Sequence, residues 1–369
     1  MELKDYFEPY DVKGLLCEKG EIGKKVSAFS EEKDFSPNEI DIAIIGVPFS
    51  GIDLKPTNAP TEIRNQLYKL ADILPVKFKI LDLGNIKKGS TFNDTLIGIR
   101  DILDYIMSHN IFTLVLGGTG LLKSALIQAL FAKGNQIEYT AIEPFPSIFN
   151  ELEMLPAQVK NFFFYNLIGS QSYYMKPMYA KWLKEKHFNH YRLGEVRENI
   201  SIVEPIIRDS DFCTISLNAL KHADAPGQEN AYPNGFYGEE ISQIARFIGL
   251  SETIKLFGLF DYYTDHDLNM QTSQLAAQLL WFVIEGYSNR IVEDVLTDND
   301  IQKFIVNHTD NSYELIFYKS EKTGRWWMEV PSQSLQNTQI IACSYEDYKQ
   351  ASEHSVPVRW IRAFQKYNS

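Results

Sequence analysis

The chain has 369 residues, 44% of them hydrophobic, so it is long enough to bury a sizeable core as one large domain or two ordinary ones. It carries 36 Lys and Arg residues against 48 Asp and Glu residues, a net charge of −12. A chain this acidic lacks the basic surface that nucleic-acid binding requires. We therefore expect no nucleic-acid partner.

Cysteine usage and hydropathy predict the compartment. Cys17, Cys213 and Cys343 are widely spaced and include no Cys-x-x-Cys pair, which argues against both a disulfide framework and a zinc ribbon. The first residues carry acids and no apolar run, and the longest apolar runs, such as 111–116, fall far short of the roughly 20 residues that span a bilayer. These features predict a reduced, cytoplasmic protein without a membrane partner.

Between residues 41 and 287, short apolar and β-branched runs alternate with longer amphipathic stretches. This alternation is typical of βα units around a mostly parallel sheet. The sequence therefore predicts an α/β fold with three αβα layers. The predicted strands are 42–47, 78–83, 112–116, 137–142, 161–168, 212–216 and 253–260. The predicted helices, with apolar residues at i, i+3 and i+4, are 60–70, 94–108, 120–131, 176–186, 195–209, 239–248 and 270–287.

The pattern changes after residue 287. Runs at 304–306, 313–319 and 325–330 are typical of strands, with a turn at 322–324, and short helices are predicted at 345–351 and 358–366. No low-complexity linker separates this part from the rest. We therefore predict a main α/β domain over 1–297 and a C-terminal antiparallel, β-rich appendage over 298–369 packed against it.

Ligands of an open parallel sheet bind beyond the carboxyl ends of its strands. One such place is the glycine-rich turn at 116–124, which contains Gly117, Gly118 and Gly120. It lacks the G-x-x-x-x-G-K-[ST] spacing of a phosphate-binding loop, and no G-x-G-x-x-G pattern is present. Nucleotide binding at this turn is therefore disfavoured.

Short motifs follow the predicted strands in a characteristic order. They are Gly46-Val47-Pro48, Ala59-Pro60-Thr61-Glu62-Ile63-Arg64, Gly117-Gly118, Ala225-Pro226-Gly227, Pro233-Asn234-Gly235 with Glu239, and Asp261 to Asp267 with Thr272. In this order they resemble the ureohydrolase family, which comprises arginase, agmatinase and formimidoylglutamase. The resemblance covers most of residues 41–287 and implies an arginase-like fold and a homo-oligomer.

The departures from the family fall on its chemistry. Family members hold two Mn²⁺ ions with one His, then Asp, His and Asp, then two further Asp, and the metals generate a hydroxide that attacks a guanidino or formimino carbon. The matching positions here are Gly120, the stretch 142–146 in which only Glu143 is acidic, Asn218 and Leu220. The resemblance therefore implies a vestigial cleft at these residues and Asp261, with no catalytic residue, no metal ligand and no Mn²⁺ cofactor.

Other polar residues near this cleft are candidates for contacting a small-molecule ligand. They are His222, Asp224, Asp265, His266 and Asp267. A rewired metal site drawn from them is the sharper alternative, although an Asp just before a helix is favoured as a cap for reasons unrelated to metals. Cys213 lies inside a predicted strand and is expected to be a buried small hydrophobe.

Three functions remain open at this point. The first is a non-catalytic descendant of the ureohydrolase fold that binds a small molecule or acts as a scaffold. The second is a C–N hydrolase of a guanidino or formimino compound with a rewired site that uses Asp261, Glu143 or His266. The third is an unrelated activity in the same pocket, since a fold alone does not determine function.

Overall fold

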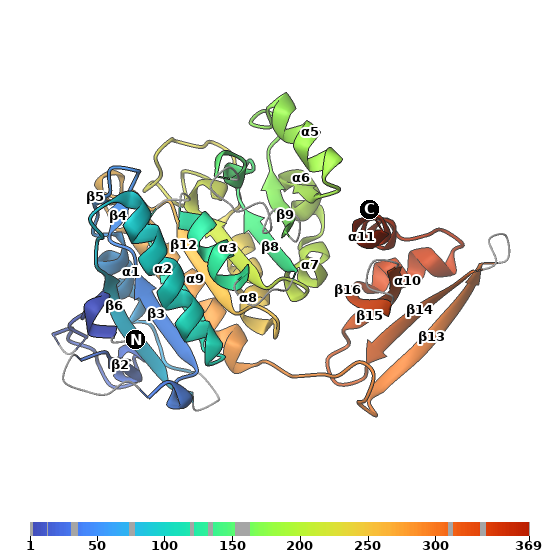
Figure 1. Ribbon diagram of the computed structural model, residues 1–369, viewed down its shortest axis with the longest axis horizontal. Coiled ribbons are helices and arrows are strands. Elements are labelled where there is room, and N and C mark those ends of the chain that lie inside the picture. The colour runs from blue at the N-terminus through green and yellow to red at the C-terminus, as the bar shows by residue number, and fades with distance from the viewer. Residues whose placement is uncertain are drawn as a thin grey trace.

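The computed structural model describes residues 3–12, 14–30, 36–73, 78–118, 122–131, 136–151, 163–308, 313–332 and 337–368. Figure 1 shows a large sheet with helices on both faces and, to one side, a smaller sheet formed by the end of the chain. In these ranges no helix is both long and apolar enough to cross a membrane.

The large sheet has the strand order β1-β6-β3-β7-β12-β11-β8-β9-β10, with β2 also paired to β6. Only β1 runs antiparallel to its neighbour among these described strands, and every other pairing is parallel. The predicted mostly parallel sheet is therefore confirmed. Its strands are β1 Phe7–Glu8, β2 Val26–Ala28, β3 Ile42–Gly46, β6 Ile80–Ile86, β7 Phe112–Leu116, β8 Ile137–Ile142, β9 Phe163–Ser170, β10 Asn189–Arg192, β11 Phe212–Ser216 and β12 Leu256–Phe260, and a separate ribbon pairs β4 Phe49–Ser50 with β5 Lys55–Pro56.

Helices cover both faces of this sheet, which gives the three predicted layers (Figure 1). Alternate residues of a strand enter different hydrophobic clusters: Ile44 of β3 packs in one, and Ala43 and Ile45 in the other. The first face carries α1 Ala59–Leu67, α6 Leu193–Glu198, α7 Glu204–Arg208, α8 Gly238–Leu250 and α9 Gln271–Ser288. The second carries α2 Phe92–Ser108, α3 Lys123–Phe131 and α5 Pro177–Glu185. Short 3₁₀ helices occur at Leu3–Asp5, Ile22–Lys24, Pro37–Glu39, Ser147–Asn150, Ile200–Val203, Leu217–Ala219 and Thr264–His266.

The single helix predicted over 195–209 is wrong. It is divided into α6, the 3₁₀ turn Ile200–Val203 and α7. Asn199 interrupts it with an extended backbone, φ −150°, and its side chain accepts a hydrogen bond from the Ser201 backbone N–H. Pro205 follows at the start of α7, where its missing N–H is tolerated. The short polar strand β10 was not predicted because it lacks the apolar run of the central strands.

The C-terminal part forms a four-stranded antiparallel sheet in the order β13-β14-β15-β16. The predicted antiparallel appendage is confirmed, with β16 as an additional strand, whereas the domain boundary at 297/298 stays a prediction. Phe317, Trp326 and Met328 form its core with the ring of Tyr348. The elements are β13 Ile301–His308, β14 Tyr313–Ser320, β15 Trp326–Ser332, β16 Asn337–Cys343, α10 Tyr345–Ser352 and α11 Val358–Asn368.

Helix α11 attaches the appendage to the amino-terminal edge of the large sheet. Lys366 forms an ion pair with Glu138 near the start of β8, and Arg359 forms one with Asp209 just before β11. The appendage therefore contacts the edge opposite to the one where ligands of open parallel sheets bind.

Candidate functional site

The carboxyl ends of β3, β7, β12, β11 and β8 meet at one edge of the sheet. After β7 the chain turns through Gly117 and Gly118, with φ values of 79° and 74°, which glycine adopts without strain. Asp261 follows β12 with a φ of 66°, and its N–H donates to the Gly118 carbonyl at 3.2 Å. Two loops are thus joined where the sequence places the candidate cleft.

A buried ion pair dominates the polar structure of this edge. Lys123 is the first residue of α3, and Glu143 directly follows β8. The Lys123 Nζ lies 2.5 Å from Glu143 Oε2 and 2.6 Å from Ser147 Oγ, with the two charged side chains 0% and 3% exposed. Charges this deeply buried persist only when they are paired and hydrogen-bonded.

Glu143 has no hydrogen-bonding capacity left over. Besides Lys123, its carboxylate accepts from the Ser147 N–H at 3.1 Å, the Ser147 hydroxyl at 2.8 Å and the Tyr165 hydroxyl at 2.6 Å. A carboxylate offers about four lone-pair positions. All four are therefore engaged by donors from this chain.

The surrounding charges keep Lys123 protonated. Burial acts to lower the pKa of its ammonium, but Glu143, with further contributions from Tyr139, Asp261 and Glu151, raises the pKa above the usual value. Glu151 behaves in the opposite way, because burial raises its pKa to about 8 despite the nearby Lys123. The Glu151 carboxyl accepts a 3.3 Å hydrogen bond from the Ser124 N–H. This edge thus combines a cation, a paired carboxylate and a carboxyl that retains its proton.

The other residues of the predicted vestigial cleft have separate surroundings. Gly120 lies outside the described residues. Leu220 is fully buried and its main chain abuts Gly235, where a Cβ would lie 2.3 Å from the Leu220 carbonyl carbon. Asn218 lies in the 3₁₀ turn after β11, and its buried Oδ1 finds no hydrogen-bond partner among the described residues. Asp261 accepts a 2.6 Å hydrogen bond from the Ser216 hydroxyl.

Two of the candidate ligand-contacting residues serve helix starts. Asp267 is buried and accepts from the N–H groups of Thr272 and Ser273, each at 3.0 Å, in the first turn of α9. Asp224 accepts from the Gly238 N–H at 2.9 Å, at the start of α8. Carboxylates that satisfy free N–H groups at a helix start are common structural caps.

The remaining candidates do not converge on a single point. Asp265 and His266 are exposed, and His266 Nδ1 lies 2.5 Å from the Gln228 carbonyl. His222 is half-buried, and its Nδ1 has no hydrogen-bond partner among the described residues. Within the described ranges, no group of three or more His, Cys, Asp or Glu side chains could hold a metal ion.

Lys123, Ser147 and Tyr165 were missed as site residues from sequence. A signal for Lys123 was present, because α3 is apolar almost all round, and a helix of this kind is buried. A lysine in its first turn therefore needs an acidic partner, and Glu143 at the end of a buried strand needs a cation. Ser147 and Tyr165 carried no comparable signal.

No family model and no curated protein matches the sequence, but solved structures do. Formiminoglutamase from Trypanosoma cruzi, crystallised with Mn²⁺ at pH 8.5, superposes with a TM-score of 0.62 at 15% identity over 69% of this chain and 95% of that chain. Formimidoylglutamase from Bacillus subtilis gives 0.60 at 18% identity, over 76% and 98%. Proclavaminate amidino hydrolase from Streptomyces clavuligerus gives 0.56 at 17% identity, over 69% and 94%.

These likenesses establish a fold, since the identities lie between 15% and 18%. They cover nearly the whole of each solved structure and leave about a quarter or more of this chain uncovered. The chain has the α/β fold of the arginase superfamily, with an additional antiparallel sheet at its C-terminal end.

Proposed function

We propose that this chain is a non-catalytic protein with the arginase fold, in which a buried ammonium instead of bound Mn²⁺ neutralises the carboxylate at the carboxyl end of β8. The observation that carries the proposal is the full engagement of Glu143 by Lys123, Ser147 and Tyr165. A carboxylate with four donors from its own chain has no lone pair to give to a metal without breaking one of those contacts.

The chemistry of the donor set supports the same conclusion. A Mn²⁺ ion requires several anionic oxygen or imidazole donors to offset its dehydration, and metal-bound hydroxide chemistry requires such a site. Of the described residues that match family ligands, Leu220 has no side-chain donor, Asn218 offers one neutral oxygen, and Glu143 is engaged. These residues do not fit a dinuclear Mn²⁺ site.

The proposed role is the binding of a small molecule or the support of other chains. A fold does not fix one function, so the arginase fold can carry a role other than metal-dependent hydrolysis. We further propose a homo-oligomer, as the resemblance implies, and a cytoplasmic location, which fits the free cysteines Cys17, Cys213 and Cys343. Light scattering that gives a mass near 42.4 kDa would contradict the oligomer.

Metal content and hydrolysis test the proposal together. The full chain is equilibrated with excess Mn²⁺, desalted and assayed for bound metal, and then given arginine, agmatine or formiminoglutamate with Mn²⁺ present. An authentic formiminoglutamase treated in parallel is the positive control. We expect neither retained Mn²⁺ nor release of urea, ammonia or formamide. Stoichiometric Mn²⁺ with metal-dependent release would overturn the proposal, and metal-independent release would favour a rewired hydrolase site at Asp261, Glu143 or His266.

A pair of variants isolates the part played by the ammonium. Both carry Gly120→His, Asn218→Asp and Leu220→Asp, and only one also carries Lys123→Ala. If the Lys123 ammonium excludes the cation, Mn²⁺ binding appears only in the variant that lacks it. Binding that appears with Lys123 in place would show that the ammonium is not the excluding group.

A further inference from the structure

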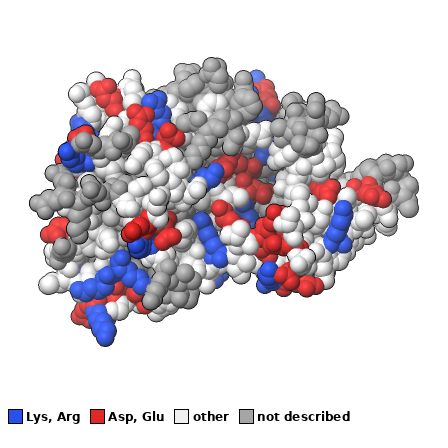
Figure 2. All heavy atoms as spheres, turned by 60° about the horizontal axis from the view of Figure 1, so that its bottom comes forward, with Lys and Arg blue, Asp and Glu red and all other residues white. Residues whose placement is uncertain are grey.

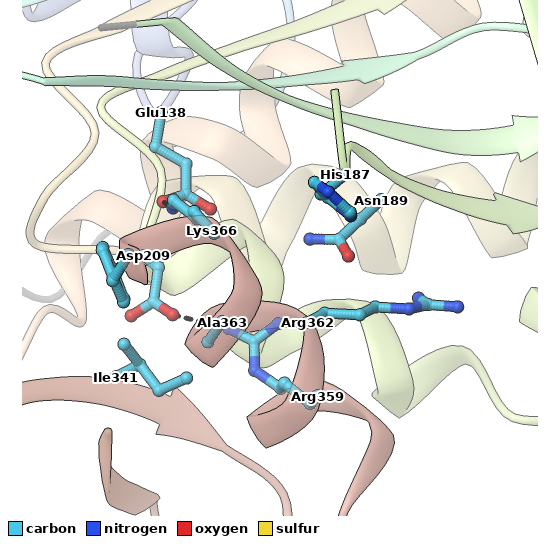
Figure 3. A pocket seen from close by; sticks show the side chains of 10 residues that line it. Glu138, His187, Asn189, Asp209, Ile341, Arg359, Arg362, Ala363 and Lys366 are labelled. Carbon is cyan, nitrogen blue, oxygen red and sulfur yellow. Dashed lines mark hydrogen bonds and ion pairs between the residues drawn. The ribbon is translucent and has the colours of Figure 1, made fainter. Parts of the chain in front are cut away.

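A pocket lies between α11 of the appendage and the amino-terminal ends of β8, β10 and β11 (Figure 3). The cavity itself has a volume of about 30 Å³, and it opens toward solvent. Arg359, Arg362, Ala363 and Lys366 line one side, at the i, i+3, i+4 and i+7 spacing that shares one helix face. The small Ala363 leaves room between three long cationic side chains.

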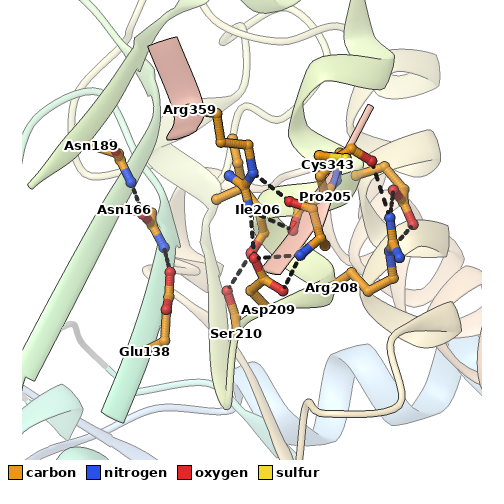
Figure 4. Close-up of polar contacts among 12 residues, drawn as sticks. Glu138, Asn166, Asn189, Pro205, Ile206, Arg208, Asp209, Ser210, Cys343 and Arg359 are labelled. Carbon is orange, nitrogen blue, oxygen red and sulfur yellow. Dashed lines mark hydrogen bonds and ion pairs between the residues drawn. The ribbon is translucent and has the colours of Figure 1, made fainter. Parts of the chain in front are cut away.

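On one side of the pocket, each acidic side chain is paired with a cation. Arg359 lies 2.5 Å from the Asp209 carboxylate and also donates to the carbonyls of Pro205 and Ala342. Lys366 lies 2.5 Å from the Glu138 carboxylate. Both acids that line the pocket are thus already paired with cations, and Figure 4 shows the Arg359 contacts with Asp209 and Pro205.

On the other side of the pocket, the cation of Arg362 has no acidic partner among the described residues. His187, Asn189 and Arg362 line it, and Figure 3 shows Arg362 extending away from Asp209 and past Asn189. Among the described residues Arg362 forms no ion pair, and its guanidinium lies 5.6 Å from the centre of the Tyr191 ring. An arginine without a carboxylate partner beside a pocket is suited to bind an oxyanion through paired N–H groups.

The side-chain amide oxygen of Asn189 accepts no hydrogen bond from the described residues. Its Nδ2 donates to Asn166 Oδ1 at 2.8 Å, and the Asn166 Nδ2 donates to Glu138 Oε1 at 3.1 Å (Figure 4). Because the Glu138 carboxylate can only accept, this relay fixes the orientation of both amides. The Asn189 side chain lines the pocket, and its buried Oδ1 accepts no hydrogen bond from a described residue. A buried acceptor of this kind favours a ligand that brings its own donor.

We propose that this pocket binds a small oxyanion that also carries a hydroxyl donor, with its negative charge on Arg362 and its O–H group directed at Asn189 Oδ1. Protonated phosphate and a short 2-hydroxycarboxylate share this chemistry. The site lies at the opposite edge of the sheet from Glu143, so it does not depend on the proposed function. It gives the additional sheet a role in ligand binding, since α11 supplies the anchoring cation.

Matched probes test the donor requirement. The full chain, in a buffer free of oxyanions, is titrated by calorimetry with phosphate, sulfate, glycolate and acetate at equal ionic strength. Sulfate and acetate resemble phosphate and glycolate but lack the hydroxyl donor. We expect phosphate to bind more tightly than sulfate, or glycolate more tightly than acetate, and whichever pair shows the difference identifies the source of the anion. Equal affinity within both pairs, or no binding at millimolar concentration, would overturn the proposal.

Variants locate the binding. Arg362→Gln should weaken binding of the preferred probe by at least about tenfold, because it removes a charge-assisted contact. Arg192→Gln removes one positive charge from β10, outside the pocket lining, and should leave the affinity nearly unchanged. Asn189→Leu should keep anion binding and lose the preference for the hydroxylated probe. Unfolding temperatures confirm that each variant is folded, and equal effects of Arg362→Gln and Arg192→Gln would contradict a specific site.

Discussion

At the carboxyl edge of the large sheet, Lys123 and Glu143 form a buried ion pair in which the carboxylate is enclosed by donors from its own chain. At the amino edge, Arg359 with Asp209 and Lys366 with Glu138 form comparable pairs, but beside them Arg362 lacks an acid among the described residues. Figure 4 shows the contact of Arg359 with Asp209, and Figure 3 shows the pocket beside it.

The two edges differ in the capacity that they retain for binding a ligand. Polar groups that are all paired within the chain stabilise the fold but cannot bind a ligand without losing a contact. An unpaired cation and an unpaired acceptor can bind a ligand directly. On the face drawn in Figure 2, Lys and Arg are interspersed with Asp and Glu. Arg362 is distinguished by its place in the pocket lining without an ion-pair partner among the described residues.

The largest effect on stability is expected at the buried ion pair of Lys123 and Glu143. Lys123→Met leaves Glu143 buried without its cation, and we expect a loss of about 3–5 kcal/mol in the free energy of unfolding. Denaturant unfolding measures the change. The exposed Lys184 on α5 provides the control, since Lys184→Met should change stability by less than about 0.5 kcal/mol. Adding Glu143→Leu to Lys123→Met should recover part of the loss, and a further loss would contradict the pairing.

Glu151 should make the carboxyl edge sensitive to pH. Its pKa is raised by burial from 4.5 to about 8 in the folded chain, so the folded state retains a proton that the unfolded state has released. Stability should therefore fall as pH rises from about 5 to 8, by about 3–4 kcal/mol, and be restored on acidification within that window.

Glu151→Gln should flatten this dependence, because the amide does not titrate. Unfolding free energies measured at intervals across the same pH window test it. The exposed Glu198→Gln is the matched control and should leave the slope as it is in the parent chain. A Glu151→Gln chain with an unchanged slope would place the proton elsewhere.

At the amino edge of the large sheet, Arg359→Met should lower the free energy of unfolding by about 2 kcal/mol. The loss is smaller than at Lys123 because the Arg359 side chain is 14% exposed. Burial also raises the pKa of Asp209 to about 6, despite Arg359, so the freed acid takes up a proton readily. Hydrogen exchange should show α11 losing protection first. Arg362→Met, which breaks no ion pair among the described residues, should leave α11 protected, and equal deprotection by both would contradict the distinction between them.

The smallest effect separates two neighbouring acids of the sequence-predicted cleft. Asp267→Ala removes the acceptor for two N–H groups at the start of α9 and should cost about 1 kcal/mol. Asp265→Ala, at an exposed position two residues earlier, should change stability by less than about 0.5 kcal/mol. Thermal unfolding of the two variants side by side is sufficient, and equal losses would mean that the cap is not what Asp267 provides.

The strong periodic patterns of the sequence were enough to predict the layers, the parallel sheet and the antiparallel appendage. The predicted helix boundaries are wrong where residues that interrupt helices outweigh the apolar periodicity. Asn199 and Pro205 divide one predicted helix in this way. The short strand β10 has no apolar run, so its existence depends on pairing with β9 and could not be predicted from local sequence.

The candidate site was predictable in position and not in its contacts. The edge of the sheet followed from strand direction, and Glu143 was identified there as the remaining acid. Lys123 is separated from Glu143 by 20 residues and meets it only because α3 carries the chain to the amino edge and the parallel strand β8 returns it to the carboxyl edge. The relay from Glu138 to Asn189 likewise joins three strands, and such long-range polar contacts leave no periodic pattern.

We propose that the ammonium of Lys123 replaces a metal cation at the carboxyl edge of the sheet. The most direct measurement is a crystal structure of the full chain equilibrated with Mn²⁺, with diffraction data collected at the Mn absorption edge. We expect no anomalous peak at the carboxyl ends of β7, β8, β11 and β12, and we expect Lys123 Nζ within hydrogen-bond distance of Glu143. A Mn²⁺ peak beside Glu143, with Lys123 displaced, would contradict it.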